Sequence, residues 1–321
     1  MNVLITCAGR RTSLLKEFAI AVHSRNGIVV AADADGLAPA AILADHAVQV
    51  PSLRDSGYVA CLEQIIKDFR VDLIVPTIDT ELMLLAANRD RLLQLGCTAL
   101  VSADKLIATL RDKFVMAGVF SEKGIGVPPS WIPEAMDVPS LPEDLFVKPR
   151  DGSASKHVYR VRKNQLDAIL PLVPNAMVQE EIEGSEITVD GLLDMEGHCI
   201  HYVPRLRLKT LAGESVQSVT IDDQDLRGWL LSVFDILGSM GGIGPMTVQA
   251  FLTDEGPILS EINPRFGGGV PLAFAAGGQY PEWILQMLEG KQIPRKIGEY
   301  KRGLWMTRHH VEIYMERPLW N

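Results

Sequence analysis

The first hundred residues alternate short apolar runs with segments of helical periodicity. Apolar runs that predict strands occupy residues 3–7, 28–33, 47–50, 73–77 and 98–101. Between them, apolar side chains recur at the spacing of a helix face over residues 12–23, 57–69 and 79–95. This alternation predicts a parallel sheet with helices on both faces. Asp33 ends the second predicted strand, but the first loop lacks the GxGxxG fingerprint, which argues against a nicotinamide site.

The pattern changes after residue 103. A helix is predicted over 113–123, and a Pro-rich connection then leads to residue 142. Strands are predicted at 145–148, 158–161, 177–180 and 186–193, with a helix near 165–170. The remainder predicts a strand at 201–208, a helix near 223–237, a hairpin and a helix at 281–288. We therefore expect an α/β unit followed by α+β units, with boundaries at residues 1–103, 104–185 and 186–321.

Composition narrows the class of protein. The chain has 321 residues, of which 47% are hydrophobic and 22% charged, as expected for two or three packed units. A net charge of -9 argues against nucleic-acid binding. The four cysteines form no CxxC pair, so neither a zinc site nor a disulfide framework is indicated. We find no signal peptide or membrane span, and we expect a cytoplasmic protein.

The strongest chemical signal is the segment Glu261-Ile262-Asn263-Pro264-Arg265. Glu261 and Asn263 are two apart on a predicted strand, so their side chains share a face. A three-residue turn at 254–256, with glycine at its left-handed position, would place Gln249 opposite Glu261. Magnesium prefers oxygen ligands and commonly shares them with phosphates. The cluster predicts a metal–nucleotide site, and a plain strand-ending turn is the alternative.

Several cations suggest contacts with an anion. Lys148 ends a predicted strand and precedes a loop of small residues, 151–157, whose amides could cradle a phosphate. A surface lysine beside an ordinary turn is the alternative, and the Walker pattern is absent. Arg205, Arg207 and Lys209 alternate along a strand and would face the same way. Such a row predicts either a bound anion or a solvated strand face.

A family resemblance follows from five motifs taken in order. They are Asp112-Lys113, Phe146-Val147-Lys148-Pro149, the acidic segment at 179–186, Val248-Gln249, and the Glu261–Arg265 segment. Alone, the acidic segment suits either an adenine and ribose or an exposed turn. Together the motifs resemble the ATP-grasp superfamily, most of all stand-alone proteins related to the carbamoyl-phosphate synthetase large subunit. The resemblance extends over nearly the whole chain. It implies a pre-ATP-grasp parallel-sheet domain followed by a two-subdomain ATP-grasp fold.

The resemblance also implies ligands and residue roles. ATP and Mg2+ would be bound, with Mn2+ as the alternative metal. The residues implied on the nucleotide are Lys113, Lys148, Ser153, Glu180, Glu181, Ile182, Glu186 and Arg207. The implied metal ligands are Gln249, Glu261 and Asn263. The cations implied in catalysis are Lys148, Arg205 and Arg265, which would neutralise the phosphoryl group in transfer.

The implied reaction is ATP-dependent ligation of a small carboxylate to an amine through an acyl phosphate, with release of ADP and phosphate. An amino acid is among the candidate substrates, and Arg10 or Arg11 is a candidate for binding a substrate carboxylate, unless both are ordinary surface residues. Family members commonly form homodimers. The alternatives are an enzyme that stops at an acyl or carbamoyl phosphate, and a non-catalytic ATP-binding protein. The single ATP-grasp unit argues against complete carbamoyl phosphate synthesis.

Overall fold

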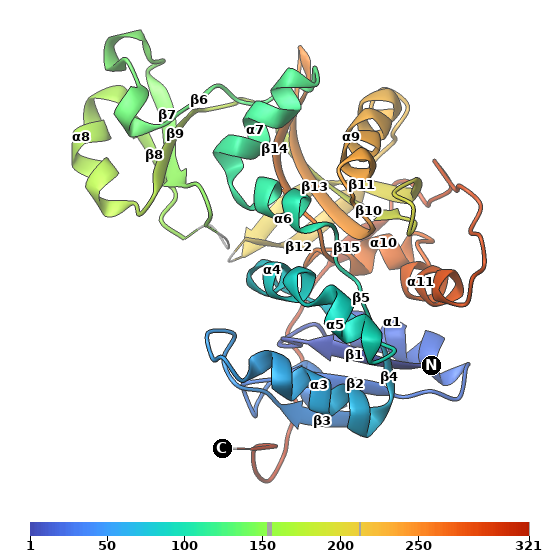
Figure 1. Ribbon diagram of the computed structural model, residues 1–321. Coiled ribbons are helices and arrows are strands. Elements are labelled where there is room, and N and C mark those ends of the chain that lie inside the picture. The colour runs from blue at the N-terminus through green and yellow to red at the C-terminus, as the bar shows by residue number, and fades with distance from the viewer. Residues whose placement is uncertain (153–155, 212, 321) are drawn as a thin grey trace.

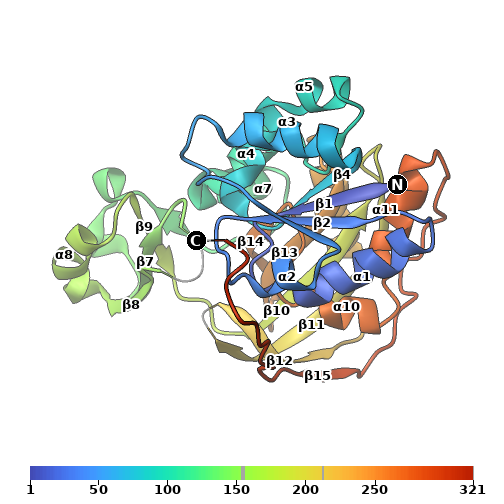
Figure 2. The ribbon, with the colours of Figure 1, turned by 90° about the horizontal axis from the view of Figure 1, so that it is seen from below.

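Three β-sheets organise the molecule. The computed structural model describes residues 1–152, 156–211 and 213–320. A five-stranded parallel sheet forms the N-terminal part, a four-stranded antiparallel sheet follows, and a six-stranded antiparallel sheet completes the fold. The four-stranded sheet projects to one side of the other two in both views (Figures 1 and 2). Among the described residues, no helix is both long and apolar enough to span a bilayer.

The N-terminal sheet has the strand order β3-β2-β1-β4-β5. Its strands are β1 (Asn2–Thr6), β2 (Val29–Asp33), β3 (His46–Gln49), β4 (Val71–Pro76) and β5 (Thr98–Ala99). The helices of this part are α1 (Thr12–His23), α2 (Pro39–Leu43), α3 (Tyr58–Phe69), α4 (Asp79–Ala87) and α5 (Arg89–Gln94). The predicted parallel sheet is confirmed. The helix predicted over 79–95 is instead divided in two at Asn88, and α2 was not predicted.

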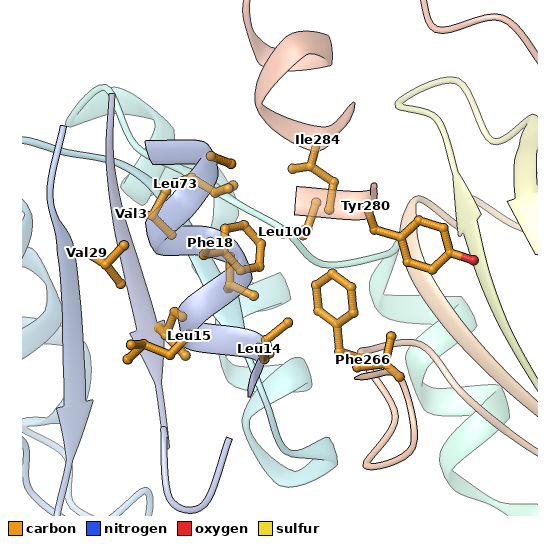
Figure 3. Packing of buried hydrophobic residues seen from close by; sticks show 14 of the residues in the cluster. Val3, Leu14, Leu15, Phe18, Val29, Leu73, Leu100, Phe266, Tyr280 and Ile284 are labelled. Carbon is orange, nitrogen blue, oxygen red and sulfur yellow. The ribbon is translucent and has the colours of Figure 1, made fainter. Parts of the chain in front are cut away.

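Both faces of this sheet are buried. Successive side chains of a strand point to opposite faces, so neighbouring residues pack in different clusters. Val3 packs in the cluster that includes α1, whereas Leu4 packs in the cluster that includes α3. The α1 cluster continues into the C-terminal part of the chain. The rings of Phe18 and Phe266 meet edge to face with centroids 5.9 Å apart (Figure 3). This shared core fixes the loop between β1 and α1 relative to the six-stranded sheet.

Two helices, α6 (Asp104–Arg111) and α7 (Lys113–Glu122), connect the N-terminal sheet to the rest. Between them, Asp112 caps α7 by accepting from the backbone N–H groups of Phe114 and Val115. Apolar side chains of both helices pack in the core of the six-stranded sheet. The domain boundaries at 103 and 185 stay a prediction.

The four-stranded sheet has the order β6-β9-β7-β8. Its strands are β6 (Ser130–Trp131), β7 (Asp144–Pro149), β8 (Tyr159–Arg162) and β9 (Ala176–Glu180). Its helical segments are α8 (Leu166–Ile169) and the 3-10 turns Pro133–Ala135, Val138–Ser140, Lys163–Gln165 and Leu170–Leu172. A small apolar cluster around Leu145 and Val178 forms a separate core. The four-stranded sheet and its helical segments therefore form a small unit with an apolar core of its own.

The six-stranded sheet has the order β14-β13-β10-β11-β12-β15. Its strands are β10 (Ser185–Leu193), β11 (Cys199–Leu211), β12 (Glu214–Thr220), β13 (Gly244–Thr253), β14 (Gly256–Asn263) and β15 (Trp305–Thr307). The helices are α9 (Arg227–Ser239), α10 (Pro271–Ala275) and α11 (Tyr280–Leu288). α9 covers one face, where Phe234 stacks on Tyr202. Leu192, Ile200 and Val203 pack instead in the cluster that includes α1, and other side chains of the sheet line a cavity.

Candidate active site

A cavity of about 790 Å³ lies where the three sheets meet. The N-terminal part contributes residues from the loops after β1 and β4, among them Arg11 and Thr77. From β1 the sheet grows to one side through β2 and β3 and then to the other side through β4 and β5, so the loops after β1 and β4 flank the point where the strand order switches. Ligands of open parallel sheets bind at such a crevice outside the carboxyl ends of the strands. The topology thus places the N-terminal wall of the cavity at a binding position.

Most of the predicted site residues line this cavity. They are Lys113, Lys148, Glu180, Ile182, Glu186, Arg205, Arg207, Gln249, Glu261, Asn263 and Arg265. Glu181 is not among the lining residues, and its carboxylate is paired with Arg160 at 2.6 Å. Ser153 lies outside the described residues, as does part of the predicted loop at 151–157.

The β13–β14 hairpin brings the predicted metal ligands together. Gln249 pairs with Glu261, as predicted, and Thr247 pairs with Asn263. The predicted three-residue turn is wrong, because Thr253 already pairs with Gly256 across a two-residue loop. A register shift between Gln249 and Ala250 restores the expected pairing. A bulge of this kind bends the strand and re-aims side chains, which suits the wall of a cavity.

Oxygen atoms of this hairpin contact neighbouring cations. The Asn263 side-chain N–H donates to Glu261 Oε1 at 3.2 Å, and Lys113 Nζ lies 4.0 Å from the same oxygen. Gln249 Oε1 accepts from Arg207 at 2.8 Å. Among the described residues, no three His, Cys, Asp or Glu side chains gather as a metal site. The hairpin therefore offers one carboxylate and two amides, a set that needs further oxygens from a ligand or water to complete an octahedral ion.

The two lysines reach the cavity from different elements. Lys148, on β7, donates to Gln179 Oε1 at 2.7 Å. Burial lowers the pKa of Lys148 to about 8; the charge of Glu261 opposes that shift and the charge of Lys113 adds to it. Lys113 is buried at the start of α7 and donates to the Gly152 carbonyl at 2.6 Å. Two desolvated ammonium groups beside one carboxylate form a strong site for phosphate oxygens.

The two arginines of the predicted cation row on β11 are paired with carboxylates of the protein, a third possibility beside the bound anion and the solvated face. Arg205 pairs with Asp190 at 2.9 Å, and Arg207 pairs with Glu186 at 2.6 Å. Both carboxylates lie on the neighbouring strand β10, which the pattern of one strand cannot reveal. Lys209 is exposed, and the register shifts between it and Arg207. The protein itself therefore supplies the anions for this face.

Ion pairs also lie at the end of the cavity near the N-terminal domain. Arg265 donates to Asp79 at 2.7 Å, and Glu214, which lines the cavity, pairs with Arg308, which does not, at 3.2 Å. Asp79, Glu214 and Arg308 were not predicted as site residues. Asp79 and Arg265 are 186 positions apart in the chain, so only the fold brings them together. Of the three residues that were not predicted, only Asp79 gave a signal in the sequence, because it lies just after an apolar strand.

The Gly267–Gly269 turn forms another wall of the cavity. A Cβ atom on Gly269 would lie 2.1 Å from Arg205 Nη2, and one on Gly267 would lie 2.7 Å from Thr247 Oγ1. These close approaches, and not a special backbone angle, require glycine here. The turn can thus pack directly on the buried Arg205–Asp190 pair.

Two family models match separate parts of the chain. Residues 3–100 match the family described as "PylC-like, N-terminal domain", and residues 173–309 match "ATP-grasp in the biosynthetic pathway with Ter operon". No curated protein matches the chain.

Several solved structures share the fold. The biotin carboxylase domain of Hydrogenobacter thermophilus 2-oxoglutarate carboxylase, in complex with MgADP, ADP and bicarbonate, aligns with a TM-score of 0.74 and 14% identity, over 95% of this chain and 73% of that one. The L-amino acid ligase from Bacillus licheniformis aligns with a TM-score of 0.67 and 16% identity, over 89% and 73%. N5-carboxyaminoimidazole ribonucleotide synthetase from Thermotoga maritima aligns with a TM-score of 0.65 and 18% identity, over 91% and 76%.

Proposed function

Because the chain belongs to the ATP-grasp superfamily, we propose that it is an ATP-dependent carboxylate–amine ligase that forms an amide bond and releases ADP and phosphate. One observation carries the proposal: Lys113, Lys148, Glu261, Asn263 and Arg265 line a single cavity. This set combines cations for phosphates with oxygens for a metal, next to an arginine that can bind a substrate acid.

ATP would lie between the four-stranded and six-stranded sheets. Lys113 and Lys148 would hold its phosphates, because both ammonium groups reach the cavity. Glu180, the last residue of β9, and Ile182, two positions further on, would bind the adenine edge. Glu186 would accept from the ribose hydroxyls while Arg207 holds its carboxylate in place. Glu181 would contribute through its backbone, since its side chain is paired with Arg160.

The β13–β14 hairpin fits Mg2+, with Mn2+ as the alternative. Glu261, Asn263 and Gln249 would hold the ion, which usually takes one or two carboxylates and completes its shell with phosphate and water oxygens. When bound, it neutralises phosphate charge. Asn263 already donates to Glu261, so the amide must turn its oxygen toward an ion. Glu261 is therefore the residue on which metal binding depends most.

The chemistry follows from the poor electrophilicity of a carboxylate. An oxygen of the substrate acid attacks the γ-phosphorus of ATP, and ADP leaves with the electron pair of the broken P–O bond. The amine nitrogen then attacks the acyl carbon, phosphate leaves, and the nitrogen loses a proton. Lys148 and Arg265 balance charge on the transferring group. Arg205 instead supports the Gly267–Gly269 turn, because its side chain is almost fully buried in the pair with Asp190 and packs directly against Gly269, whereas the Arg265–Asp79 pair is more open to the cavity.

The substrates would be a small carboxylate and a small amine, with amino acids among the candidates, as the name of the L-amino acid ligase from Bacillus licheniformis suggests. Homodimerisation and a cytoplasmic location stay predictions.

A screen of carboxylates and amines, bicarbonate included, tests the proposal by measuring nucleotide products. We expect ADP release that depends on an acid, and a product whose mass equals acid plus amine minus water. Glu261→Ala should lower the rate by about a hundredfold or more, the usual range for loss of a transition-state electrostatic contact. Glu255→Ala is the matched control, because Glu255 is exposed in the turn of the same hairpin.

Each part of the proposal has its own contradicting result. Release of AMP and pyrophosphate would rule out an acyl phosphate. Full activity of the Glu261→Ala variant would overturn the metal assignment. ADP formation without any coupled amine product would favour an enzyme that stops at the acyl or carbamoyl phosphate.

A further inference from the structure

We propose that the acid substrate of this enzyme carries a second anionic group, and that Arg11 binds that group. The inference rests on the proposed ligase function and names its substrate class: dicarboxylates, or carboxylates bearing a phosphate. It follows from the balance of charges at the end of the cavity formed by the loops after β1 and β4.

The carboxylates that line this end already have partners. Asp79 accepts two hydrogen bonds from Arg265, at 2.7 and 3.0 Å. Glu214 pairs with Arg308, which also donates to the Gly268 carbonyl. Each of these acids is therefore neutralised by a cation from another part of the chain.

Arg11 differs from these arginines in its side-chain contacts. Within residues 1–152, 156–211 and 213–320, no carboxylate forms an ion pair with it, and the one hydrogen bond of its side chain is a long contact of 3.5 Å to the Thr77 carbonyl. Burial lowers the pKa of Arg11 to about 10; the charges of Arg265 and Arg308 add to that shift, and the charges of Glu214 and Asp79 oppose it. A half-buried guanidinium without an ion-pair partner of its own is unfavourable and becomes favourable when an anion binds.

Arg10 also lines the cavity without an ion-pair partner among the described residues, but it is exposed. Solvent and salt screen an exposed charge far more than a half-buried one. Arg11 is therefore the cation that gains most from a bound anion.

The nucleotide does not account for this charge. Lys113 and Lys148 lie beside Glu261, where the phosphates are proposed, whereas Arg11 follows β1. An amino acid bound as a zwitterion fits less well, because its ammonium group needs a carboxylate and both Asp79 and Glu214 are occupied. A substrate that places its reacting acid group near Arg265 and a second acid group on Arg11 supplies the anion that Arg11 lacks.

Hydroxylamine trapping isolates the acid subsite from the amine subsite. Hydroxylamine carries no carboxylate; its nitrogen attacks the acyl carbon, phosphate leaves, and loss of a proton gives a hydroxamate. The probes are matched pairs: succinate and butanoate, glutarate and pentanoate, adipate and hexanoate, 3-phosphoglycerate and glycerate. We expect kcat/KM for the best dianionic probe to exceed that of its monoanionic partner by about tenfold to a hundredfold, the range of a charge-assisted hydrogen bond.

Variants assign the preference to Arg11. In Arg11→Gln the preference should collapse through KM for the acid, while KM for ATP stays unchanged; Arg11→Lys should retain part of it. Arg54→Gln is the matched control, because Arg54 is an exposed arginine of the same domain that does not line the cavity. The thermal midpoint and MgADP binding of each variant report whether it has folded.

Three outcomes overturn the inference. Equal or better use of the monoanionic probes contradicts it and leaves the ligase function intact. A dianion preference that survives in Arg11→Gln assigns the second group elsewhere. If no acid in any panel supports ADP release while MgADP still binds, the ligase function itself fails, and the inference fails with it.

Discussion

Replacing Lys148 with methionine should make the protein more stable and less able to bind nucleotide. Lys148 is a half-buried ammonium group whose hydrogen-bond partner is the neutral Gln179. Burial lowers its pKa from 10.5 to about 8, so the folded state disfavours the charged form. Methionine has a similar length and no charge, and it removes this penalty.

The size of the effect follows from the pKa shift. A shift from 10.5 to about 8 corresponds to about 3 kcal/mol at pH 7, where both states carry the proton. Loss of the bond to Gln179 offsets about 1 kcal/mol, and partial exposure reduces the total further. We expect a net gain of about 1–2 kcal/mol, a rise of a few degrees in the melting temperature.

The pH dependence has a defined sign. Between pH 8 and pH 10.5 the unfolded chain holds a proton on Lys148 that the folded chain has lost, so wild-type stability rises with pH in that window. The advantage of Lys148→Met should therefore be greatest below pH 8 and vanish near pH 10.5.

Urea denaturation of both proteins at pH 7 and pH 10.5 measures this difference, and titration with MgADP measures binding. Binding should weaken by about tenfold or more, as expected for loss of a charge-assisted contact. Lys16→Met, an exposed position on α1, should change stability by less than about 0.5 kcal/mol. A loss of stability in Lys148→Met at pH 7, or a gain that persists at pH 10.5, would refute the reasoning.

Two further predictions concern the interior. Burial raises the pKa of Glu81 to about 7, so wild-type stability should fall as the pH rises from 4.5 to 7. In urea denaturation, Glu81→Gln should remove that pH dependence and be more stable than the wild type by at most about 3 kcal/mol at pH 8. An unchanged pH dependence in the variant would contradict the assignment to Glu81. Gly269→Ala should lose about 1–3 kcal/mol and impair catalysis, because its Cβ would overlap Arg205. Gly228→Ala, at an exposed position of α9 with open space around it, should instead gain about 0.5–1 kcal/mol, and equal effects of the two substitutions would contradict the steric argument.

Periodicity predicted most of the elements because it reports how a segment meets the core. Residues 12–23 are helical as predicted, since their apolar positions fit one face of a helix against the sheet. β12 and the edge strand β15 were not predicted, because both are defined by pairing: β12 lies between β11 and β15, and β15 pairs with β12. α6 was missed although its apolar positions pack on the six-stranded sheet.

The site was predictable where its residues are close in sequence. Two residues on one hairpin, Gln249 and Glu261, were paired correctly, although a bulge and a shorter turn produce that register. The ion pairs were not predictable. Asp190 neutralises Arg205 from another strand, and Arg308 reaches Glu214 from the C-terminal segment. Such contacts depend on the tertiary fold, which a linear pattern does not encode.

The most direct test of the central claim follows an oxygen atom. A carboxylate that turns over is supplied with 18O in both carboxyl oxygens, together with ATP, Mg2+ and the amine. If the acid attacks the γ-phosphorus and the amine then displaces phosphate, one 18O atom passes into each molecule of released phosphate. The account predicts this label in phosphate, detected by its 31P chemical shift, and unlabelled ADP. Unlabelled phosphate, or label found in AMP, would contradict an acyl-phosphate ligase.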